Sequence, residues 1–285
     1  MLMEILNDPL TLRLFEELKY KPSALYKTFG IPKRNGTIRR IDEPREDLKC
    51  IQRSIAKRLV KENDFPSEIT AISGRGLKNH LLPHVGKKLV ITHDIENFFP
   101  SVKPSLVRES LLQHSTYSAD DVNSIVSLTT YDGSVPQGAP SSVVITGLVL
   151  IAAINRVKKI FPKAMSNFSI YVDDLAISGD NSAFKILDEL SVEFSRIGLK
   201  LNKSKRHIMR SNRNTPVICG LEVGEEIKVT SEYLHQIIEE LSSYSLCQLS
   251  DVDPKLYGKI NHVKNYNNSQ FSIINSKLEE NEIVF

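Results

Sequence analysis

Apolar positions near the start of the chain follow a helical repeat. Four of them, spaced three or four residues apart, share one face of a helix predicted over residues 48–60. They are Leu48, Ile51, Ile55 and Leu59. Basic residues recur every fourth position beside that face, at Lys49, Arg53, Lys57 and Lys61. Such a face is commonly just solvated, and it is equally what a helix facing phosphate groups presents.

The segment before that helix predicts a short hairpin. Residues 31–44, IPKRNGTIRRIDEP, place Asn35-Gly36 between two short strands, and this dipeptide favours a tight two-residue turn. The same segment adds the cations Lys33, Arg34, Arg39 and Arg40. Residues 27–61 are therefore more basic than the rest of the chain, which is typical of a surface that meets nucleic acid or a nucleoside triphosphate.

Three apolar runs further along predict buried elements. Residues 89–92 indicate a buried strand that ends at Asp94, and residues 143–154 indicate a helix that is apolar on nearly all sides. The run IYVDDLAISG sets Asp173 and Asp174 side by side between strand-forming residues. A solvated hairpin turn is the simplest interpretation of that pair, because aspartate tolerates turn geometry.

The rest of the chain alternates helices with short strands. One amphipathic helix is closed by Gly198, a typical C-terminal position for glycine. The stretch PVICGLEV then predicts a strand pair, in which Gly220 suits a bulge or a close backbone approach. Two apolar faces near the end are helical: Leu234, Ile237, Ile238 and Leu241, then Leu256, Ile260 and Val263. This interleaving predicts the α+β class, a sheet layered with helices and followed by a helical tail.

Composition narrows the class without choosing a partner. The 285 residues are 41% hydrophobic and 25% charged, as expected of a globular chain with a sizeable core, and the net charge of +3 is mild. Cys50, Cys219 and Cys247 form no CxxC pair, which indicates a reducing compartment and no structural zinc. The start shows no secretory signal, and the longest apolar run is too short to span a bilayer. We therefore expect a cytoplasmic protein with no membrane partner.

Asp94 adds a third carboxylate to the pair at Asp173 and Asp174. A strand-end aspartate alone commonly caps the next helix, so by itself it is weak evidence for chemistry. Together the three side chains make an oxygen-ligand set suited to Mg²⁺. Two such ions, typically about 3.5–4 Å apart, activate an attacking hydroxyl and stabilise a leaving pyrophosphate. Because the metal ions would neutralise them, adjacent aspartates become tolerable inside an apolar run.

Six motifs stand along the chain in a recognisable order. They are IPKRNGTIRRIDEP, DIENFF around Asp94, PQGAPSS, YVDD, GLKLNKSK and ICGLEV, and they cover about residues 27–224. In this order they resemble the motifs of reverse transcriptases, and most closely those of the bacterial retron-type enzymes. Two departures are visible. HLLPH, from His80 to His84, keeps only the final histidine of the retron N-A-x-x-H, and ICG stands where V-T-G is usual.

The resemblance implies an RNA-directed DNA polymerase (reverse transcriptase) of the α+β class with a right-hand architecture. The fingers would comprise residues 1–86 and 103–140. The palm, an antiparallel sheet with helices, would comprise residues 87–102 and 141–224. A small helical thumb would comprise residues 225–285.

The resemblance also implies a role for each matching residue. Catalysis and the binding of two Mg²⁺ ions would fall to Asp94, Asp173 and Asp174. Nucleotide binding would fall to Lys33 and Arg39 on the triphosphate, Phe99 as a steric gate, Gln137, Gly138, and Lys205 as the proton donor to pyrophosphate. Primer and template contacts would fall to Tyr171, Cys219, Gly220 and Leu221 and, from spacing only, to Lys255 and Lys259.

Two histidines near these motifs have simpler expected roles. His93 neighbours Asp94 along a strand, so its side chain would point to the opposite face and pack there. His84 is expected to be structural or to contact RNA, and not to be a catalyst.

The retron resemblance further implies partners. They are a structured noncoding RNA template and its DNA product, deoxynucleoside triphosphates, a separate effector protein and, because few residues follow ICGLEV, a host RNase H. The protein would copy part of that RNA in an anti-phage defence system. Three alternatives stay open: a related defence-associated reverse transcriptase with different priming or untemplated synthesis, an RNA-dependent RNA polymerase, and a non-catalytic RNA-binding scaffold. Phe99 argues against the RNA polymerase, and the three aspartates argue against the scaffold.

Overall fold

The computed structural model describes residues 5, 8–33, 36–114, 116–161, 166–245, 248 and 252–283. Its helices are α2 (Pro9–Tyr20), α3 (Glu46–Glu62), α4 (Leu77–Leu81), α5 (Phe98–Ser101), α6 (Pro104–His114), α7 (Ala119–Thr129), α8 (Ser142–Ile160), α9 (Ser182–Arg196), α10 (Ser231–Leu241), α11 (Pro254–Tyr266) and α12 (Asn268–Glu280). Single 3₁₀ turns are η1 (Pro22–Leu25), η2 (Leu82–His84) and η3 (Lys203–Lys205). Its strands are β1 (Tyr26–Pro32), β2 (Ile38–Pro44), β3 (Leu89–Asp94), β4 (Ser166–Tyr171), β5 (Asp174–Gly179), β6 (His207–Arg210), β7 (Val217–Ile218), β8 (Leu221–Val223) and β9 (Ile227–Val229).

The elements predicted from the apolar patterns are present. α3 contains the helix expected over residues 48–60, α8 contains the apolar helix, and β3 ends at Asp94 as expected. A hairpin forms around the predicted turn and pairs Pro32 with Ile38. Three residues of the sequence argument lie outside the described residues: Arg34, Asn35 and Cys247.

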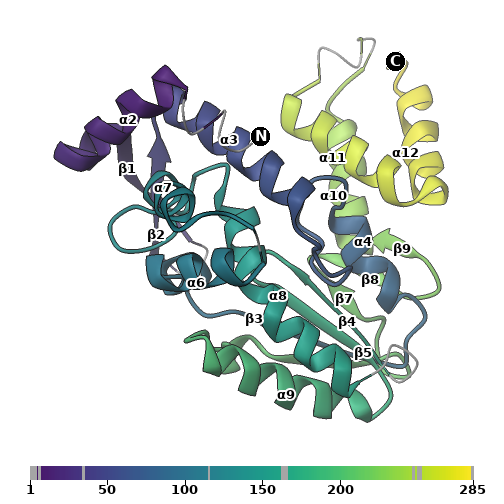
Figure 1. Ribbon diagram of the computed structural model, residues 1–285. Coiled ribbons are helices and arrows are strands. Elements are labelled where there is room, and N and C mark those ends of the chain that lie inside the picture. The colour runs from purple at the N-terminus through teal and green to yellow at the C-terminus, as the bar shows by residue number, and fades with distance from the viewer. Residues whose placement is uncertain are drawn as a thin grey trace.

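A four-stranded antiparallel sheet in the order β4-β5-β3-β6 forms the centre of the molecule (Figure 1). Successive residues of a strand face opposite sides of a sheet. In β3, Leu89 and Ile91 accordingly lie in one hydrophobic cluster and Val90 lies in another. β5 repeats the division, with Ile177 in the first cluster and Ala176 in the second. The sheet therefore separates two cores.

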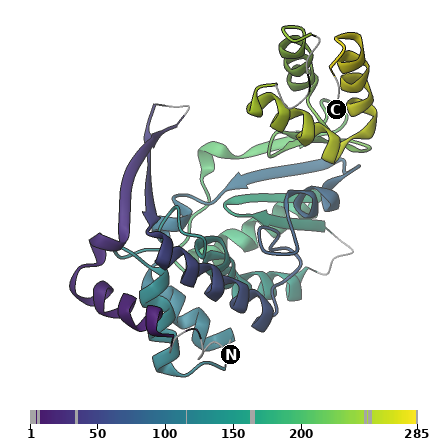
Figure 2. The ribbon, with the colours of Figure 1, turned by 90° about the horizontal axis from the view of Figure 1, so that it is seen from above.

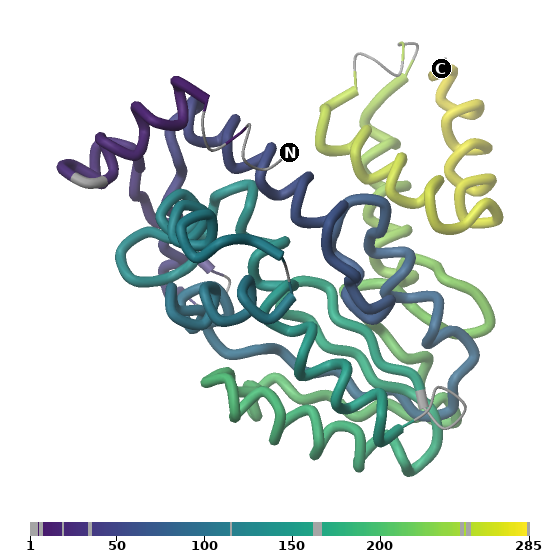
Figure 3. Tube along the Cα trace, in the orientation of Figure 1, coloured from purple at the N-terminus to yellow at the C-terminus, as the bar shows by residue number. Residues whose placement is uncertain are grey.

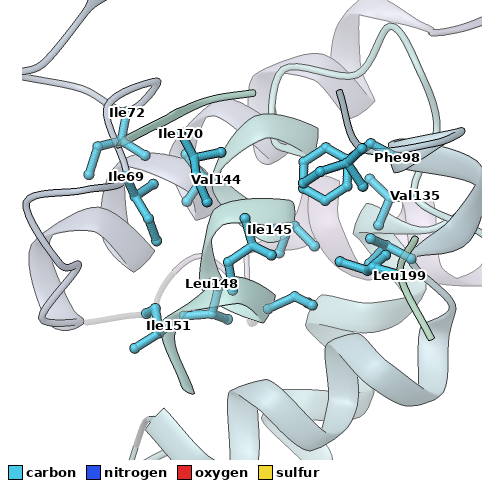
Figure 4. Close-up of a cluster of buried hydrophobic side chains, with 14 of the residues drawn as sticks. Ile69, Ile72, Phe98, Val135, Val144, Ile145, Leu148, Ile151, Ile170 and Leu199 are labelled. Atoms are coloured by element: carbon cyan, nitrogen blue, oxygen red, sulfur yellow. The ribbon is translucent and has the colours of Figure 1, made fainter. Parts of the chain in front are cut away.

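α8 is the central helix of the larger core. Twelve of its nineteen residues are buried, which explains why its sequence is apolar on nearly all sides. Figure 4 shows Ile145 and Leu148 of α8 among the buried side chains of this core. Gly147 lets a neighbouring segment come close, because a Cβ there would lie 3.2 Å from Ile69 and 3.4 Å from Phe65. α3, α6 and α9 pack against the same helix.

The smaller core joins β7–β9 to the three C-terminal helices. Figure 2 shows these helices grouped at one end of the molecule, and each contributes a fully buried isoleucine: Ile237, Ile260 and Ile274. Val90 and Ala176 of the central sheet belong to the same cluster. The C-terminal helices therefore stand on the face of the sheet that α8 does not cover.

Strands β1 and β2 form a separate hairpin that projects from the rest of the molecule (Figure 2). Six of the seven residues of β1 are exposed, including Phe29 and Ile31. Tyr26, at the base, is the buried residue of the strand, and its ring stacks on Tyr131 at 4.0 Å. The hairpin is therefore attached mainly through its base.

One local expectation is wrong. Gly220 forms neither a bulge nor a close approach, because a Cβ there would meet nothing within 4 Å. It makes the two-residue turn between β7 and β8 together with Cys219, and both residues have positive φ angles, 48° and 80°. Two consecutive positive φ angles are the signature of a tight hairpin turn, for which glycine is favoured.

The trace runs from the projecting hairpin through the central sheet to the C-terminal helices (Figure 3). The predicted boundary between residues 224 and 225 falls between β8 and β9, which are paired strands of one three-stranded sheet. Within the described ranges, no helix is both long enough and apolar enough to cross a membrane.

Candidate active site

Three strand ends meet at one place and bring the predicted carboxylates together. In the register of β3 and β5, Asp94 lies directly opposite Asp174, so both side chains point to the same face of the sheet. The two-residue turn Val172–Asp173 joins β4 to β5. The amide of Ile95 donates a hydrogen bond of 2.9 Å to the carbonyl of Asp173 and ties this turn to the end of β3.

The turn has a strained backbone. Val172 has φ +58°, a left-handed value that a β-branched residue rarely adopts. Strain of this kind costs on the order of 1–3 kcal/mol and persists only where the surroundings impose it. Here Tyr171 and Asp174 pair across the turn, and Ile170 and Leu175 behind them are buried. The strands therefore hold Asp173 in position beside Asp94.

The carboxylates perturb one another. Burial, and then the charges of Asp94 and Asp174, raises the pKa of Asp173 to about 6. Burial also raises the pKa of Asp174, against the lowering effect of its hydrogen bond from Cys219. Negative charge is thus concentrated where water is partly excluded, and such a place favours the binding of cations.

Lys205 and Cys219 reach these carboxylates from other elements. Lys205 Nζ, at the end of η3, donates a hydrogen bond of 2.6 Å to Asp94 Oδ2, which raises the pKa of Lys205. Cys219 Sγ, in the β7–β8 turn, lies 3.6 Å from Asp174 Oδ2. Burial raises the pKa of this thiol to about 12, so it stays protonated and can donate. Two residues predicted for the nucleotide and the primer therefore contact the acidic cluster itself.

The chemistry of this donor set fits divalent cations. In the part of the chain that the structure describes, no three His, Cys, Asp or Glu side chains are already gathered as a finished metal cage. The ammonium of Lys205 instead stands beside Asp94, as a positive charge. The remaining carboxylate oxygens are the ligands that Mg²⁺ prefers, and burial together with their mutual repulsion raises the pKa of Asp173. A cation placed among them would relieve that repulsion.

The residues predicted to bind the nucleotide lie on several segments of the chain. Lys33 and Arg39 lie at the exposed tip half of the projecting hairpin. Phe98 and Phe99 lie in α5, five residues or fewer beyond β3, with ring centroids 5.8 Å apart. Phe98 is 3% exposed in the larger core, whereas Phe99 is partly buried at its border. The two rings therefore occupy the different environments that their adjacency predicts.

Gln137 and Gly138 contact the projecting hairpin. The amide of Asp42 in β2 donates a hydrogen bond of 2.8 Å to the carbonyl of Gln137, and a Cβ on Gly138 would lie 3.0 Å from the carbonyl oxygen of Asp42. The Asp42 carboxylate accepts hydrogen bonds from Thr28 at 2.6 Å and from Arg40 at 2.9 Å. Strand β2 thus approaches the backbone at Gly138 closely. Asp42 is a central residue of this region that the motif comparison missed.

Arg40 connects the hairpin to the loop that carries Gln137. Its Nη1 lies 2.8 Å from Oδ2 of Asp132. Asp132 and Gly133 form a tight turn between Tyr131 and Ser134, a few residues before Gln137. The hairpin and the loop are therefore held together by a side-chain ion pair as well as by the backbone of Asp42.

The predicted basic region divides into paired and exposed cations. Lys49 forms ion pairs with two glutamates, at 2.6 and 2.7 Å. Arg53 and Lys57 of α3 are exposed and line a pocket of about 560 Å³. The same pocket reaches Tyr171 and Val172, at the turn that carries Asp173. Part of the basic face therefore lies next to this turn.

The C-terminal unit contributes aromatic residues that the motifs did not indicate. Tyr266 lies at the end of α11, and burial, with smaller contributions from the neighbouring Tyr171 and Cys219, raises its pKa. The ring of His262 lies 4.9 Å from that of Tyr266. The spacing of these two residues, one helical turn apart, was the available signal, but such a pair is more often part of a helix interface.

The remaining predicted contacts have mixed surroundings. Leu221 is 1% exposed and belongs to the smaller core, so from that motif the turn at Cys219 is what reaches the acidic cluster. Lys255 is exposed at the start of α11. Lys259 forms an ion pair with Glu240 of α10.

A buried polar cluster lies behind the β4–β5 hairpin. His84 is fully buried, with Nδ1 2.6 Å from the hydroxyl of Ser178 and Nε2 2.8 Å from the hydroxyl of Ser169. The Ser169 hydroxyl also lies 2.8 Å from Nδ1 of His80. Burial lowers the pKa of His80 to about 4 and that of His84 to about 3, so both rings are neutral at neutral pH. Of the two roles expected for His84, the structural one holds, because a side chain without exposure cannot contact RNA.

Three carboxylates gathered at one end of a sheet are the kind of ligand set that two-metal nucleotidyl transfer uses. The chain belongs to the reverse transcriptase (RNA-dependent DNA polymerase) family, whose model matches residues 31–240. The resemblance to this family, read from six motifs, is therefore confirmed.

Curated relatives point to the retron branch. The retron Mx65 reverse transcriptase of Myxococcus xanthus is 29% identical over 238 residues, which cover 74% of this chain and 56% of the relative. The retron Se72 reverse transcriptase of Salmonella heidelberg (strain 579083-10) is 28% identical and covers 78% of this chain and 63% of its own length. The retron Ec86 reverse transcriptase of Escherichia coli is 26% identical, over 76% of this chain and 68% of the relative. The chain thus spans between 56% and 68% of the length of these relatives.

Solved structures share the fold at low identity. Telomerase from Candida tropicalis, without bound nucleic acid, matches with a TM-score of 0.56 at 11% identity, over 91% of this chain and 58% of that one. Telomerase from Candida albicans, solved with a fragment of telomeric RNA, matches with a TM-score of 0.55 at 11% identity, over 96% and 61%. At this identity the likeness establishes the mixed helix-and-sheet fold and nothing further.

Proposed function

We propose that the protein is an RNA-directed DNA polymerase that copies part of a structured noncoding RNA into DNA. The observation that carries the proposal is the direct pairing of Asp94 with Asp174 across two strands, with Asp173 in the adjoining turn. Membership of the reverse transcriptase family supports the activity, and the retron relatives support the kind of template.

The proposal divides the chain as a right hand. The fingers comprise residues 1–86 and 103–140, the palm comprises residues 87–102 and 141–224, and the thumb comprises residues 225–285. The separate hydrophobic cluster around the C-terminal helices supports a distinct thumb, although that cluster also includes β7 and β8.

In the proposed mechanism Asp94, Asp173 and Asp174 hold two Mg²⁺ ions. The bound ions would lower the pKa of the primer 3′-hydroxyl and balance charge on the leaving pyrophosphate. Lys33 and Arg39 bind the triphosphate, and the planar guanidinium of Arg39 can make two parallel hydrogen bonds to it. Lys205, hydrogen-bonded to Asp94 without substrate, can turn to the pyrophosphate and donate a proton there.

Other residues select and position the substrates. Phe99 packs against the incoming sugar and leaves no room for a 2′-hydroxyl. Gln137 and Gly138 shape the nucleotide pocket through their contacts with β2. Tyr171 and the turn at Cys219 hold the primer end, and Gly220 and Leu221 support that turn. Lys255 and Lys259 face the template–primer backbone.

The proposed partners follow the retron relatives. They are a structured noncoding RNA, its DNA product, deoxynucleoside triphosphates, a separate effector protein and a host RNase H that removes copied RNA. The setting would be an anti-phage defence system. Sequencing the nucleic acid that co-purifies with the protein identifies the RNA and shows whether the DNA is its copy.

The acidic cluster is tested by Asp173→Asn and Asp174→Asn, each assayed for incorporation of labelled dNTP on an RNA template with Mg²⁺. Each change removes one charged ligand and keeps the shape of the side chain, so synthesis should fall by more than tenfold while the melting temperature changes little. Activity within tenfold of wild type in both variants would contradict the metal assignment.

Asp188→Asn is the matched control, because Asp188 is an exposed aspartate on α9, away from the strand ends. It should leave incorporation unchanged. If wild type itself incorporates no nucleotide but binds RNA, the non-catalytic scaffold replaces the polymerase.

The choice between DNA and RNA synthesis is tested at the paired phenylalanines. Phe99→Val should raise incorporation of ribonucleotides relative to deoxyribonucleotides with modest loss of stability. Phe98→Ala should instead lower the free energy of unfolding by about 3–5 kcal/mol, because Phe98 is 3% exposed. Unchanged selectivity in Phe99→Val with relaxed selectivity in Phe98→Ala would mean that the two roles are reversed.

A further inference from the structure

Three arginines lie along the free edge of the central sheet. β6 is the last strand in the order β4-β5-β3-β6, and Arg206, Arg210 and Arg213 precede, end and follow it. All three are exposed. We call these residues the outer arginine row.

The register of β6 turns two of these arginines away from the catalytic carboxylates. Directly paired residues point to the same face, and Arg210 is paired with Leu89, a residue of the larger core. Asp94 lies five residues further along β3, an odd number, so its side chain points to the other face. Arg206 precedes Arg210 by four residues and shares its face. Its charge also contributes, after burial, to the lowered pKa of His93, whose side chain lies on that face.

Among the described residues, no helix packs extensively against β6 at this edge of the sheet. α9 packs over β4 and β5, at the other side of the sheet. Ile208, between the arginines and on the same face, is consequently 44% exposed. The row thus forms an open strip of surface at the edge of the sheet, with Arg206 and Arg210 on the face opposite Asp94.

The charges of the row are not neutralised within the protein. Among the described residues, none of the three arginines has a salt-bridge partner within 4.0 Å. The amide of Arg213 donates a hydrogen bond of 2.9 Å to the carbonyl of Arg210, so the two like charges are kept within one turn. The exposed residues that flank Arg213 in the chain have hydroxyl or amide side chains: Ser211, Asn212, Asn214 and Thr215.

We propose that the outer arginine row binds the sugar–phosphate backbone of RNA that continues beyond the acidic cluster. Arginine forks match phosphate oxygens, and serine, threonine and asparagine commonly add phosphate contacts. The stretch 206–215 contains no Phe, Tyr or Trp on which bases could stack, so it would hold the backbone and not read sequence. The stretch has one exposed aliphatic residue, Ile208, which disfavours a protein partner. The inference rests on the proposed function only in taking RNA as a substrate.

The length of the strip suits an extended polyanion. From Arg206 to Arg210 the strand covers about 13 Å at the usual rise of about 3.3 Å per residue. The row therefore continues from the acidic cluster, where Lys205 contacts Asp94, toward the opposite end of β3. RNA that passes Lys205 on its way out from the acidic cluster would meet the outer arginine row next.

The test compares Arg210→Gln/Arg213→Gln with wild type in the full chain, using two labelled RNA probes and no nucleotide. One probe is a hairpin of about 30 base pairs, three helical turns, and the other is a primer–template of about 10 base pairs, one turn. The variant should bind the long hairpin more weakly, with a slope of log Kd against log salt smaller by about two, one for each lost phosphate contact. Binding of the short duplex should stay unchanged, because it is too short to reach the outer arginine row from the acidic cluster.

Lys159→Gln/Lys185→Gln is the matched control, because it removes two exposed charges from α8 and α9. It should leave both probes unaffected. An unchanged salt slope for the long hairpin in the arginine variant, or an equal loss with the short duplex, would overturn the proposal. Because binding is measured without synthesis, this result decides the matter even if the chain incorporates no nucleotide.

Discussion

Two hairpins serve the same proposed site and are built in opposite ways. The β4–β5 hairpin lies inside a sheet, and seven of its residues are buried: Phe168, Ser169, Ile170, Leu175, Ala176, Ile177 and Ser178. The β1–β2 hairpin projects into solvent, with six exposed residues in β1 alone. The first carries the carboxylates at its turn, and the second carries Lys33 and Arg39.

The difference reflects what each hairpin holds. Carboxylates that repel one another have to be fixed by their surroundings, and burial of the strands behind Asp173 supplies that constraint. Cations that meet a triphosphate gain from exposure, because they remain hydrated and reachable until the ligand arrives. Stability is therefore concentrated under the acidic groups, and reach is provided on the basic side.

The two hairpins also use different polar ties. Behind β4–β5, His84 bonds to Ser169 and Ser178 in a site without solvent. At β1–β2, Arg40 pairs with Asp132 at the surface. A buried hydrogen bond is costly to lose, whereas a surface ion pair contributes little to stability. The surface tie is thus suited to position and not to stabilise.

The largest difference should appear on truncating one isoleucine in each hairpin. Ile177→Ala in β5 should lower the free energy of unfolding by about 2–5 kcal/mol, because Ile177 is fully buried. Ile38→Ala in β2 should change it by less than about 0.5 kcal/mol, because Ile38 is 72% exposed. Urea unfolding of both variants measures this directly, and comparable losses would show that the projecting hairpin is integral to the core.

Acid should act on the buried tie next. Burial holds the pKa values of His80 and His84 at about 4 and about 3, well below the ordinary 6.5. As the pH falls through 6.5 the unfolded chain takes up protons that the folded chain does not. Stability is therefore complete above pH 6.5 and is lost on acidification, by up to about 1.4 kcal/mol per pH unit for each histidine.

Removal of His84 isolates this effect. His84→Gln should lower stability at pH 7 and reduce the slope of unfolding free energy against pH between 6.5 and 5, measured by urea unfolding at each pH. His235→Gln, on the exposed side of α10, is the control and should keep the wild-type slope. A slope in His84→Gln equal to that of wild type would mean that His84 is protonated in the folded state.

The smallest effect on stability, with a distinct effect on kinetics, is expected at the surface tie. Asp132→Asn weakens the attachment of Arg40, so the hairpin should be less well positioned over the nucleotide. KM for dNTP should rise severalfold with kcat nearly unchanged, and the melting temperature should hold. Asp132→Glu should restore much of the loss. A fall in kcat at constant KM would instead show that the tie does not position the nucleotide.

Local patterns were sufficient for the elements and the acidic cluster. β3, α3 and α8 follow from apolar spacing within one segment, and the Asp173–Asp174 turn follows from an acidic pair in an apolar run. Asp94 was grouped with Asp173 and Asp174 from its strand end and from the motif order, and the register places it opposite Asp174. The elements and the turn depend on neighbours in sequence, whereas the grouping of Asp94 with the turn depended on the resemblance to reverse transcriptases.

Contacts between distant segments could not be predicted in this way. The links of Asp42 to Thr28, Arg40 and Gln137 join residues up to 95 positions apart, and nothing local marks Asp42 as special. The same holds for His84 with Ser169, 85 positions later. The basic segment was also overestimated as a free surface, since pairing of Lys49 depends on how β2 meets α3.

The central sheet contributes side chains to both hydrophobic cores, and this limits how the chain can be divided into fragments. Val90 and Ala176 reach through the central sheet into the cluster of the C-terminal helices, and Met209 packs against that cluster from β6. A cut between residues 224 and 225 would uncover these side chains and separate β8 from β9. The two lobes should therefore melt in one cooperative transition, and a fragment without its last sixty residues would be prone to aggregate. The C-terminal helices therefore stabilise the same sheet whose strand ends carry Asp94 and Asp174.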